Sequence, residues 1–511
     1  MTVMVHAPDA EGTAESAAQT AMSTRASRPM RTWAVILAAC AGQFLVVLDV
    51  SVVNVALPSM RADLGLSTTG LQWVLNAYSI AFAGFMLLGG RAADIFGRKL
   101  MFLTGLGLFT AASVAGGLAQ EGWQLVAARA VQGLGAAVLA PATLTIVTAA
   151  VPPGPARTRA IGTWTAVGAA GGAAGGLVGG VLTDLLSWRW VLLINVPVGA
   201  LVLIGAAIWF TESRAGGGTS HAEGRGGGRR LDLPGAVLVT GGLAAVAYGI
   251  VQTEESGWTA PGTLLPLLGG LAVLALFVAV EARTGAPLMP LKVFRSRAVS
   301  AANVAMFVCG SASFAMWFFM TVYAQNVLGY TPLEAGLALI PSSVSVIVGS
   351  KLAPRLMVRA GARNVAAIGA LVAATGFGWQ STMTAEGTYF TTILGPGILM
   401  MAGAGLATTP LASLATSGAA PGDAGLVSGL INTSRTMGGA LGLATLSTVA
   451  AARTAGGTDP QALTAGYALA FRTGTGLLLV AAVLMLLWLP GAAASKESVQ
   501  DSSAGSGTAR D

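Results

Sequence analysis

Charged residues are scarce in this sequence. Asp, Glu, Lys and Arg together make up 10% of the 511 residues, whereas they make up about a quarter of an ordinary soluble protein. Hydrophobic residues make up 54%, so most of the chain cannot face water. The composition excludes a soluble globular protein and predicts an integral membrane protein.

Cysteine and histidine are nearly absent as well. Cys40 and Cys309 lie in apolar segments, where a thiol behaves as a small hydrophobic group, so neither a disulfide framework nor a cysteine-based metal site is indicated. The only histidines, His6 and His221, lie in a tail and a linker. The sequence has no P-loop, and its apolar segments hold no combination of nucleophile and base. We therefore expect no enzyme activity, no metal and no cofactor, so that any energy would come from an ion gradient.

The apolar segments are long enough to cross a membrane. A helix spans the hydrocarbon core with roughly 20 apolar residues, and hydropathy on this scale predicts fourteen transmembrane helices. A transmembrane barrel is excluded because stretches such as LLLVAAVLMLLWLP, residues 477–490, are apolar on every face. The predicted fold is an all-α integral membrane protein with spans at 33–57, 72–91, 100–119, 123–146, 161–182, 191–210, 235–252, 262–281, 299–324, 333–353, 364–382, 389–410, 424–451 and 467–489.

The distribution of basic residues predicts the orientation. An even number of spans places both termini on one side, and most Lys and Arg residues fall on that side, whereas only Arg61, Arg189 and Arg453 fall in loops on the other. The positive-inside rule then makes both termini cytoplasmic, in a multi-pass protein of the inner or plasma membrane. The net charge of +7 is explained by this topology and by attraction to anionic lipid, and needs no nucleic-acid partner.

A Gly- and Arg-rich segment divides the chain after six spans. Its composition predicts a flexible linker. The remaining eight spans then divide into a central pair and a last set of six. Two related six-helix bundles with the substrate site between them are a known transporter plan. The predicted parts are a disordered cytoplasmic tail (1–31), a six-helix bundle (32–210), a cytoplasmic linker (211–234), two inserted helices (235–282), a second six-helix bundle (283–490) and a second disordered tail (491–511).

Two charged residues fall deep inside predicted spans. A charge at mid-membrane costs roughly 2.5 to 3.5 kcal/mol on insertion scales, so it normally faces a cavity, a partner or a pathway. Asp49 and Arg129 lie at similar predicted depths, which allows contact. Burial favours the protonated form of a carboxyl group and a nearby guanidinium favours the charged form, so the pair could act as a proton switch. The alternative is a fixed ion pair that only orients helices; the usual role of intramembrane ionisable residues favours the switch.

Other residues are weaker candidates. Arg435 is deep in span 424–451 and could line a cavity, whereas Arg472 is close enough to a span end to reach the interface. Trp317 and Tyr323 could stack on an aromatic or cationic ligand, although contact with lipid would also explain them. We predict a substrate cavity lined by Asn54, Gln132, Trp317, Tyr323, Asn432 and Arg435. The glycines of span 161–182 allow close helix packing, and could also form a hinge or a seal against proton leakage.

Several stretches resemble the major facilitator superfamily, and specifically the fourteen-helix drug:proton antiporter family (EmrB/QacA type), over roughly residues 32 to 490. LDVSVVNVALP, Leu48 to Pro58, is similar to the first-helix motif of that family, which implies that Asp49 takes part in proton coupling. RAVQGLGAA, Arg129 to Ala137, is similar to the helix-four motif, whose arginine is implicated in proton transfer.

Further motifs follow in the expected order. GRAADIFGRK, Gly90 to Lys99, resembles the loop between the second and third helices and implies a gating role for Gly90, Asp94, Gly97, Arg98 and Lys99. The antiporter motif of the fifth helix is matched by Gly162, Gly171, Gly175, Gly179 and Gly180, with Gly176 where the motif has proline. SWRWVLLINVP, Ser187 to Pro197, resembles a stretch of the fourteen-helix branch.

The resemblance implies a proton-driven exporter of drugs or antibiotics that works by alternating access. Its expected partners are a small amphipathic or cationic organic substrate, protons and membrane lipid, and the protein is expected to be a monomer. Span 333–353 offers only Glu334 as an acid, near its outer end, which argues against specificity for dications. Two alternatives are proton-coupled uptake of a small organic solute and a membrane sensor or scaffold that transports nothing.

Overall fold

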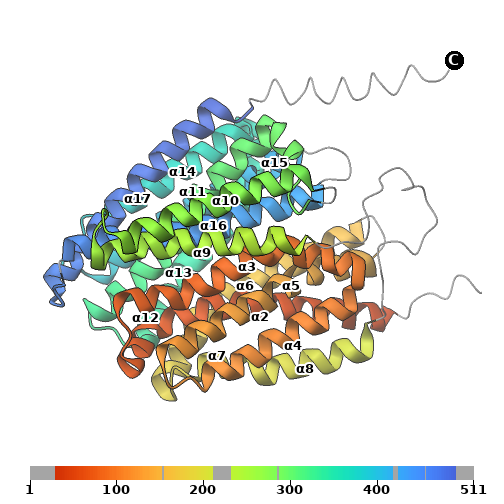
Figure 1. The fold of residues 1–511 in the computed structure, drawn as a ribbon, viewed down its shortest axis with the longest axis horizontal. Helices are drawn as coiled ribbons and strands as arrows, with labels where there is room; N and C mark the ends of the chain where they lie inside the picture. The colour runs from red at the N-terminus through yellow and green to blue at the C-terminus, as the bar shows by residue number, and fades with distance from the viewer. Residues whose placement is uncertain are drawn as a thin grey trace, which may run out of the picture.

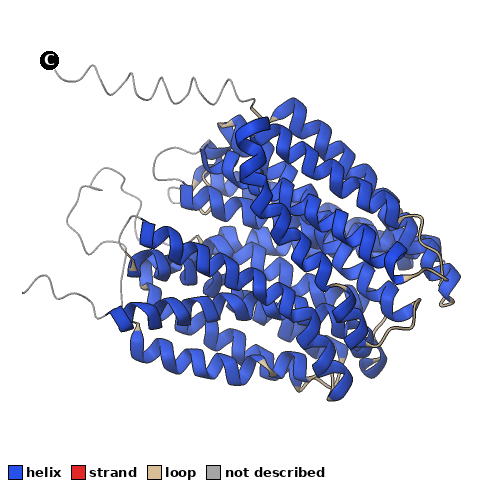
Figure 2. Cartoon of the chain, turned by 180° about the vertical axis from the view of Figure 1, so that it is seen from behind, coloured by secondary structure: helices blue, strands red, loops and turns tan. Residues whose placement is uncertain are grey.

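The computed structural model describes residues 29–151, 155–210, 232–284, 287–417, 424–454 and 456–490. These residues form helices and connecting turns, without a strand among them, and the helices make two groups with a pair between them (Figures 1 and 2). The predicted tails, except for residues 29–31, and most of the predicted linker lie outside the described residues. The all-helical membrane architecture predicted from the sequence is confirmed.

The first group is built from the residues of the first six predicted spans. It contains α2 (Pro29–Leu64), α3 (Thr68–Phe96), α4 (Arg98–Gly117), α5 (Gly122–Ala150), α6 (Pro155–Leu185), α7 (Trp190–Leu193) and α8 (Asn195–Trp209). The expected single span 191–210 is therefore interrupted at Ile194, which places Asn195 at the start of α8. The expected end of the first span before Pro58 is also wrong, because α2 continues through this proline to Leu64. Neighbouring helices in a membrane bundle tolerate such an internal proline.

The second group is built from the last six predicted spans. It contains α11 (Arg297–Asn326), α12 (Pro332–Ala338), α13 (Ile340–Ala360), α14 (Ala362–Gln380), a π-helical turn η2 (Phe390–Leu394), α15 (Gly395–Ser417), α16 (Ala424–Thr454) and α17 (Pro460–Trp488). Between the groups lie α9 (Leu233–Ser256) and α10 (Pro261–Arg283), followed by a short 3-10 turn, η1 (Leu291–Arg295). We call the two groups the N-half and the C-half.

Twelve helical stretches in the described residues are long and apolar enough to cross a membrane. The two other predicted spans, 364–382 and 424–451, correspond to α14 and α16, which are helices of 19 and 31 residues. In α16 the polar run from Asn432 to Thr436 lowers the hydropathy. Both helices pack among neighbours of the C-half, α14 on α15 and α17, and α16 on α11, so they complete the bundle of six.

The inserted pair covers one side of the seam between the halves. α9 packs on α3 of the N-half and on α16 of the C-half, and α10 packs on α9. Ile80 of α3, Leu243 and Ala247 of α9, and Ala440 of α16 form one buried apolar cluster. The pair therefore bridges the halves instead of extending either of them.

The halves touch at one end of the molecule and diverge toward the other (Figure 1). We call the end where α2 begins and α17 ends the terminal end, and the opposite end the distal end. At the distal end α6 contacts α12, and α2 contacts α11 and α12. Gln325 Nε2 of α11 donates a hydrogen bond to the Val55 carbonyl oxygen of α2 at 2.8 Å, and a buried apolar cluster runs from Leu57 of α2 to Ala335 of α12. The distal end is closed in this arrangement.

Candidate functional site

Asp49 lies in the middle of α2 with 0% of its surface exposed. Its Oδ2 accepts a hydrogen bond from Arg129 Nη1 of α5 at 2.6 Å. Its Oδ1 accepts from Gln132 Nε2 at 2.7 Å and from Asn195 Nδ2 at 2.8 Å. Three donors on two oxygens give the carboxyl group the hydrogen bonds that it needs where water does not reach it.

Arg129 is 1% exposed and is held from several sides. Its Nη1 also donates to Gln132 Oε1 at 2.6 Å, and its Nε donates to the Val74 carbonyl oxygen of α3 at 3.2 Å. The guanidinium lies over the ring of Tyr78, 4.4 Å from the centroid, where the ring quadrupole attracts a cation. Arg129 therefore connects Asp49 of α2 to α3 and α5.

Two residues that the sequence analysis did not select complete the cluster. Ser113 Oγ of α4 accepts from Gln132 Nε2 at 2.9 Å and from Asn195 Nδ2 at 3.3 Å, and it donates to the Phe109 carbonyl oxygen at 2.8 Å. Ser113 and Asn195 are both 0% exposed. The only signal in the sequence for either residue was the amide of Asn195 in the apolar stretch LLINVP. We call Asp49, Ser113, Arg129, Gln132 and Asn195 the carboxylate cluster.

The carboxylate cluster can exchange a proton only if its hydrogen bonds rearrange. Protonation of Asp49 removes the charge that Arg129 neutralises, and it replaces an acceptor with a donor. Arg129 would then keep Gln132 Oε1, the Val74 carbonyl oxygen and the Tyr78 ring as partners. In the arrangement observed, the contact between Asp49 and Arg129 ties α2 to α5.

The residues predicted to line a cavity do not come together in one place. Gln132 belongs to the carboxylate cluster. Asn54 is 9% exposed, and its Nδ2 donates to the Val50 carbonyl oxygen of its own helix at 2.8 Å. Tyr323 is 0% exposed, and its hydroxyl donates to the Thr384 carbonyl oxygen at 2.7 Å. Tyr323 therefore does not face an open cavity, because it is packed in the distal core of the C-half.

Arg435 and Asn432 lie together on α16. Arg435 Nη2 and Nε donate to Asn432 Oδ1 at 3.0 and 3.3 Å, and the Arg435 side chain is exposed. Asn432 Nδ2 approaches Met86 Sδ of α3 at 3.3 Å, so this pair lies where the C-half meets the N-half. Trp317 of α11 is half-buried. Arg435 therefore lies in the C-half, whereas Asp49 and Arg129 lie in the N-half.

The glycines of α6 form two contact faces. A Cβ on Gly171, Gly175 or Gly179 would come within 2.9, 2.3 and 2.8 Å of atoms of α2. Gly176 and Gly180 face α12 of the C-half, where a Cβ on Gly180 would lie 2.6 Å from Leu333 Cα. A Cβ on Gly336 of α12 would lie 2.0 Å from the Gly176 carbonyl oxygen. The motif therefore packs α6 on α2 with one face and closes the distal end with the other.

Gly162, the first glycine of this motif, lies within α6, but its surroundings and the side chain of Asp94 lie outside what the structure describes. In the predicted gating loop, Gly97 joins α3 to α4 with φ 113°, a conformation that L side chains rarely adopt. Lys99 Nζ donates to the carbonyl oxygens of Ala207 and Phe210 at 2.8 Å, at the end of α8. A Cβ added to Gly90 would have Pro141 Cβ as its nearest neighbour, at 3.7 Å, so a side chain would fit at this position. Arg98 is half-buried.

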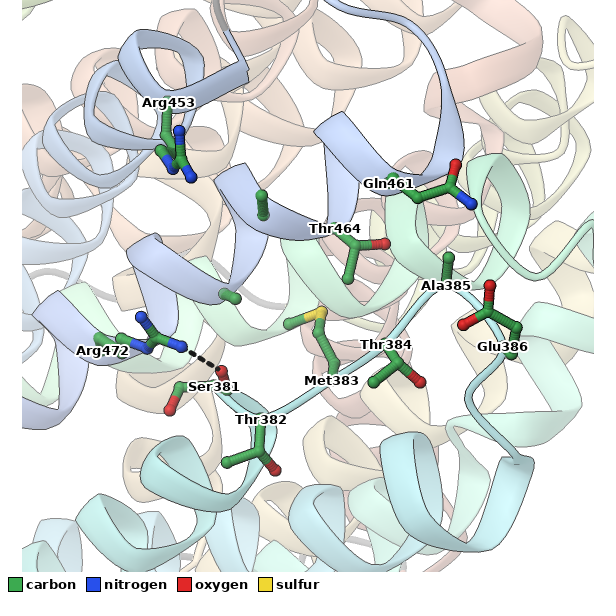
Figure 3. Close-up of a pocket in the computed structure, with 12 residues that line it drawn as sticks. Ser381, Thr382, Met383, Thr384, Ala385, Glu386, Arg453, Gln461, Thr464 and Arg472 are labelled. Atoms are coloured by element: carbon green, nitrogen blue, oxygen red, sulfur yellow. Dashed lines mark hydrogen bonds between the residues drawn. The ribbon is translucent and has the colours of Figure 1, made fainter.

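A cavity of about 450 Å³ lies at the distal end of the C-half. It is formed by the segment from Ser381 to Glu386 and by the distal ends of α16 and α17. Arg453 and Arg472 line one side and Glu386 the other (Figure 3). Arg472 Nη2 donates to the Ser381 carbonyl oxygen at 3.5 Å. This cavity lies within one half and away from the carboxylate cluster.

Comparison with known proteins identifies the family to which this chain belongs. A family model described as the Major Facilitator Superfamily matches residues 39–443. This chain belongs to the major facilitator superfamily. Its architecture and its relatives are those of transporters, and the chain is not an enzyme.

Curated relatives of this superfamily member cover nearly the whole chain. A cephamycin export protein from Amycolatopsis lactamdurans is 47% identical over 92% of this chain and 95% of its own length. A puromycin resistance protein from Streptomyces alboniger is 37% identical over 89% and 91%. A lincomycin resistance protein from Streptomyces lincolnensis is 32% identical over 93% and 94%.

Solved structures of the superfamily share the fold. A bacterial homologue of the lysosomal transporter Spinster, in an inward-facing and unoccupied conformation, aligns with a TM-score of 0.61 at 19% identity and covers 93% of this chain and 99% of its own. An auto-inhibited peptide transporter aligns with a TM-score of 0.67 at 15% identity over 90% and 96%. The fold is therefore shared with transporters whose sequences differ widely.

Replacing Asn195 with leucine should destabilise the N-half. The change removes one donor to Asp49 Oδ1 and one donor to Ser113 Oγ, and a hydrogen bond to a charged group contributes about 1.5 to 3 kcal/mol. Thermal unfolding of the full chain in detergent should therefore begin at a lower temperature in Asn195→Leu than in wild type. Asn364→Leu, at an exposed asparagine of α14, is the control, and an unchanged unfolding temperature in Asn195→Leu would contradict the assignment.

Replacing Gly180 with alanine should open the distal end. The added Cβ would meet backbone atoms of α12 at 2.6 Å, so the two halves must separate. Gly172→Ala on the same helix is the matched control, because its nearest contact is Val47 Cγ1 at 3.5 Å. Spin labels on the exposed residues Gln120 and Gln461, in a chain with Cys40 and Cys309 replaced by alanine, should show a longer distance in Gly180→Ala only. Equal distances in both variants would show that this contact does not hold the distal end closed.

Proposed function

We propose that this transporter exports small organic molecules of the antibiotic type, and that inward movement of protons through Asp49 drives the export. The observation that carries the proposal is the full burial of Asp49 against Arg129 with three donors on its carboxylate. Relatives named for cephamycin export and for puromycin and lincomycin resistance support the direction and the substrate class.

The arrangement of the halves supports loading from the terminal end. The distal end is closed by α6 and α12, and the halves diverge toward the terminal end (Figure 2). The excess of Lys and Arg at that end supports a cytoplasmic location for this end and for both chain termini. In this orientation a cytoplasmic molecule would enter between the halves, and the closed distal end would stop it from leaving outward.

The proposed cycle couples this arrangement to the proton. When the distal end opens, Asp49 takes up a proton from outside, and the charged hydrogen bond to Arg129 is lost. The substrate leaves on the same side. After the distal end closes again, the proton leaves toward the cytoplasm, and Asp49 returns to Arg129, Gln132 and Asn195. The alternation needs no cofactor, because the proton gradient supplies the energy.

The carboxylate cluster comes entirely from one half of one chain, which supports a monomer as the working unit. Lipid surrounds the bundle, and basic residues at the terminal end would attract anionic headgroups. Uptake of a solute coupled to the same proton site would reverse the direction of flux, and a sensor or scaffold would show no flux. The two relatives named for resistance and the one named for export favour outward movement.

Asp49→Asn should abolish the dependence of transport on the proton gradient. The amide cannot take up a proton, so the two states of the cluster no longer differ. In inside-out membrane vesicles, wild type should accumulate a cephamycin when a proton gradient is imposed, and the variant should accumulate at least tenfold less.

The control is Asp459→Asn, because Asp459 is a cap residue at the start of α17 whose Oδ1 accepts from Ala462 N, and asparagine can keep this bond. Flux in the opposite direction would support uptake instead. Gradient-dependent accumulation that is equal in wild type and Asp49→Asn would overturn the role of Asp49.

A further inference from the structure

Arg435 is an exposed cation inside a membrane span. It lies eleven residues after the start of α16 at Ala424, roughly 16 Å along a helix that rises 1.5 Å per residue. The helix has 31 residues, roughly 46 Å, against a hydrocarbon core of about 30 Å, so Arg435 falls inside the core. An exposed guanidinium at this depth faces either lipid or an aqueous space, and lipid is the costlier surrounding.

The neighbours of α16 show which of these it faces. A Cβ on Gly310 of α11 would lie 2.1 Å from the Arg435 carbonyl oxygen, and a Cβ on Gly438 would lie 1.9 Å from the Phe307 carbonyl oxygen. This close contact fixes the rotation of α16 on α11. Asn432, one turn before Arg435, reaches Met86 of α3. The Arg435 side chain therefore lies between α11 of the C-half and α3 of the N-half, in the seam where a substrate would pass.

No carboxylate in the described part of the chain neutralises Arg435. Its hydrogen bonds go to Asn432 Oδ1, a neutral acceptor. Among the described side chains, Asp49 is the only acid in the middle of a helix, and it is engaged by Arg129. The remaining helical acids lie within a turn of a helix end: Asp63, Asp184, Glu281 and Glu334.

The wall beside Arg435 is partly aromatic. On α11, Phe314 and Trp317 follow Gly310 at helical spacing, and both are half-buried. A Cβ on Gly439 of α16 would lie 2.6 Å from the Phe314 ring, so this ring lies one turn along α16 from Arg435. An aromatic surface next to an uncompensated guanidinium fits a molecule with an apolar body and an acidic group.

We infer that Arg435 binds an acidic group of the transported molecule, and that the substrate class is therefore amphipathic organic anions. This rests on the proposed function and narrows it, because a cationic substrate would meet like charge at this point in the seam. Asn432 positions the guanidinium, leaving Nη1 without a hydrogen bond to the described residues and available to a carboxylate. The apolar body of the molecule lies against Phe314 and Trp317.

The charge of the substrate changes the electrical work of the cycle. When an anion leaves the cytoplasm as protons enter, each cycle moves one more elementary charge than it does with a neutral substrate. A membrane potential that is negative on the cytoplasmic side therefore accelerates export of an anion more than export of its neutral analogue. This dependence reports the charge of the transported molecule, whereas the comparison of Arg435 variants reports which residue binds it.

The test compares cefoxitin, which carries one carboxylate, with its neutral methyl ester. Equilibrium dialysis on the full chain in nanodiscs should show at least tenfold tighter binding of the acid by wild type. Arg435→Gln should lose this preference, Arg435→Lys should keep most of it, and Arg453→Gln, at the distal end of the same helix, should behave as wild type. In proteoliposomes with a potential set by potassium and valinomycin, the acid should respond more steeply than the ester.

Three outcomes separate this inference from the proposed function. Equal binding of acid and ester by wild type, or an Arg435→Gln chain that folds and keeps the preference, would overturn the role of Arg435. Gradient-driven export of cationic puromycin without transport of cefoxitin would overturn the anionic class while the proton-driven exporter stands. Preferential binding of the acid without proton-coupled flux of any of these compounds would overturn the proposed function and leave the binding assignment in place.

Discussion

The buried ion pair between Asp49 and Arg129 is the interaction on which the rest of the N-half depends. Two charges without contact to water are tolerated only if nearly every polar atom finds a partner, and removing one member of such a pair typically costs about 3 to 5 kcal/mol. Here the partners come from α2, α4, α5 and α8, with α3 supplying the Val74 carbonyl oxygen and the Tyr78 ring. These helices are therefore tied into one body around Asp49.

The glycines of α6 transmit this constraint to the seam. Gly175 and Gly179 hold α6 against α2 close to Ser51 and Val52, a few residues after Asp49. Gly180, on the other face of the same helix, touches the backbone of α12 in the C-half. Because neither contact leaves room for a side chain on α6, α6 cannot adjust by changing rotamers. A shift of α2 would therefore be passed on to α12, and this is the route by which the proposed protonation of Asp49 would act on the closure between the halves.

The sequence was sufficient to predict residues that contrast chemically with their surroundings. Asp49 and Arg129 are visible because a charge in an apolar run is costly, and the glycine motif is visible by its spacing. Ser113 and Asn195 were not found, because a serine or a single amide is ordinary in a membrane helix until its neighbours are known. The break at Ile194, which sets the position of Asn195, has no marker in an apolar stretch. The two faces of α6 were not predictable either, because they depend on the rotation of that helix between α2 and α12.

The separation of Arg435 from the Asp49–Arg129 pair assigns a particular role to α3. The proposed proton site is in the N-half and Arg435 is in the C-half, so coupling between them would require an element that contacts both. α3 provides the Arg129 contacts through Val74 and Tyr78, and its Met86 meets Asn432. A rearrangement at Asp49 and Arg129 would therefore reach Arg435 through α3, without a direct contact between the two sites.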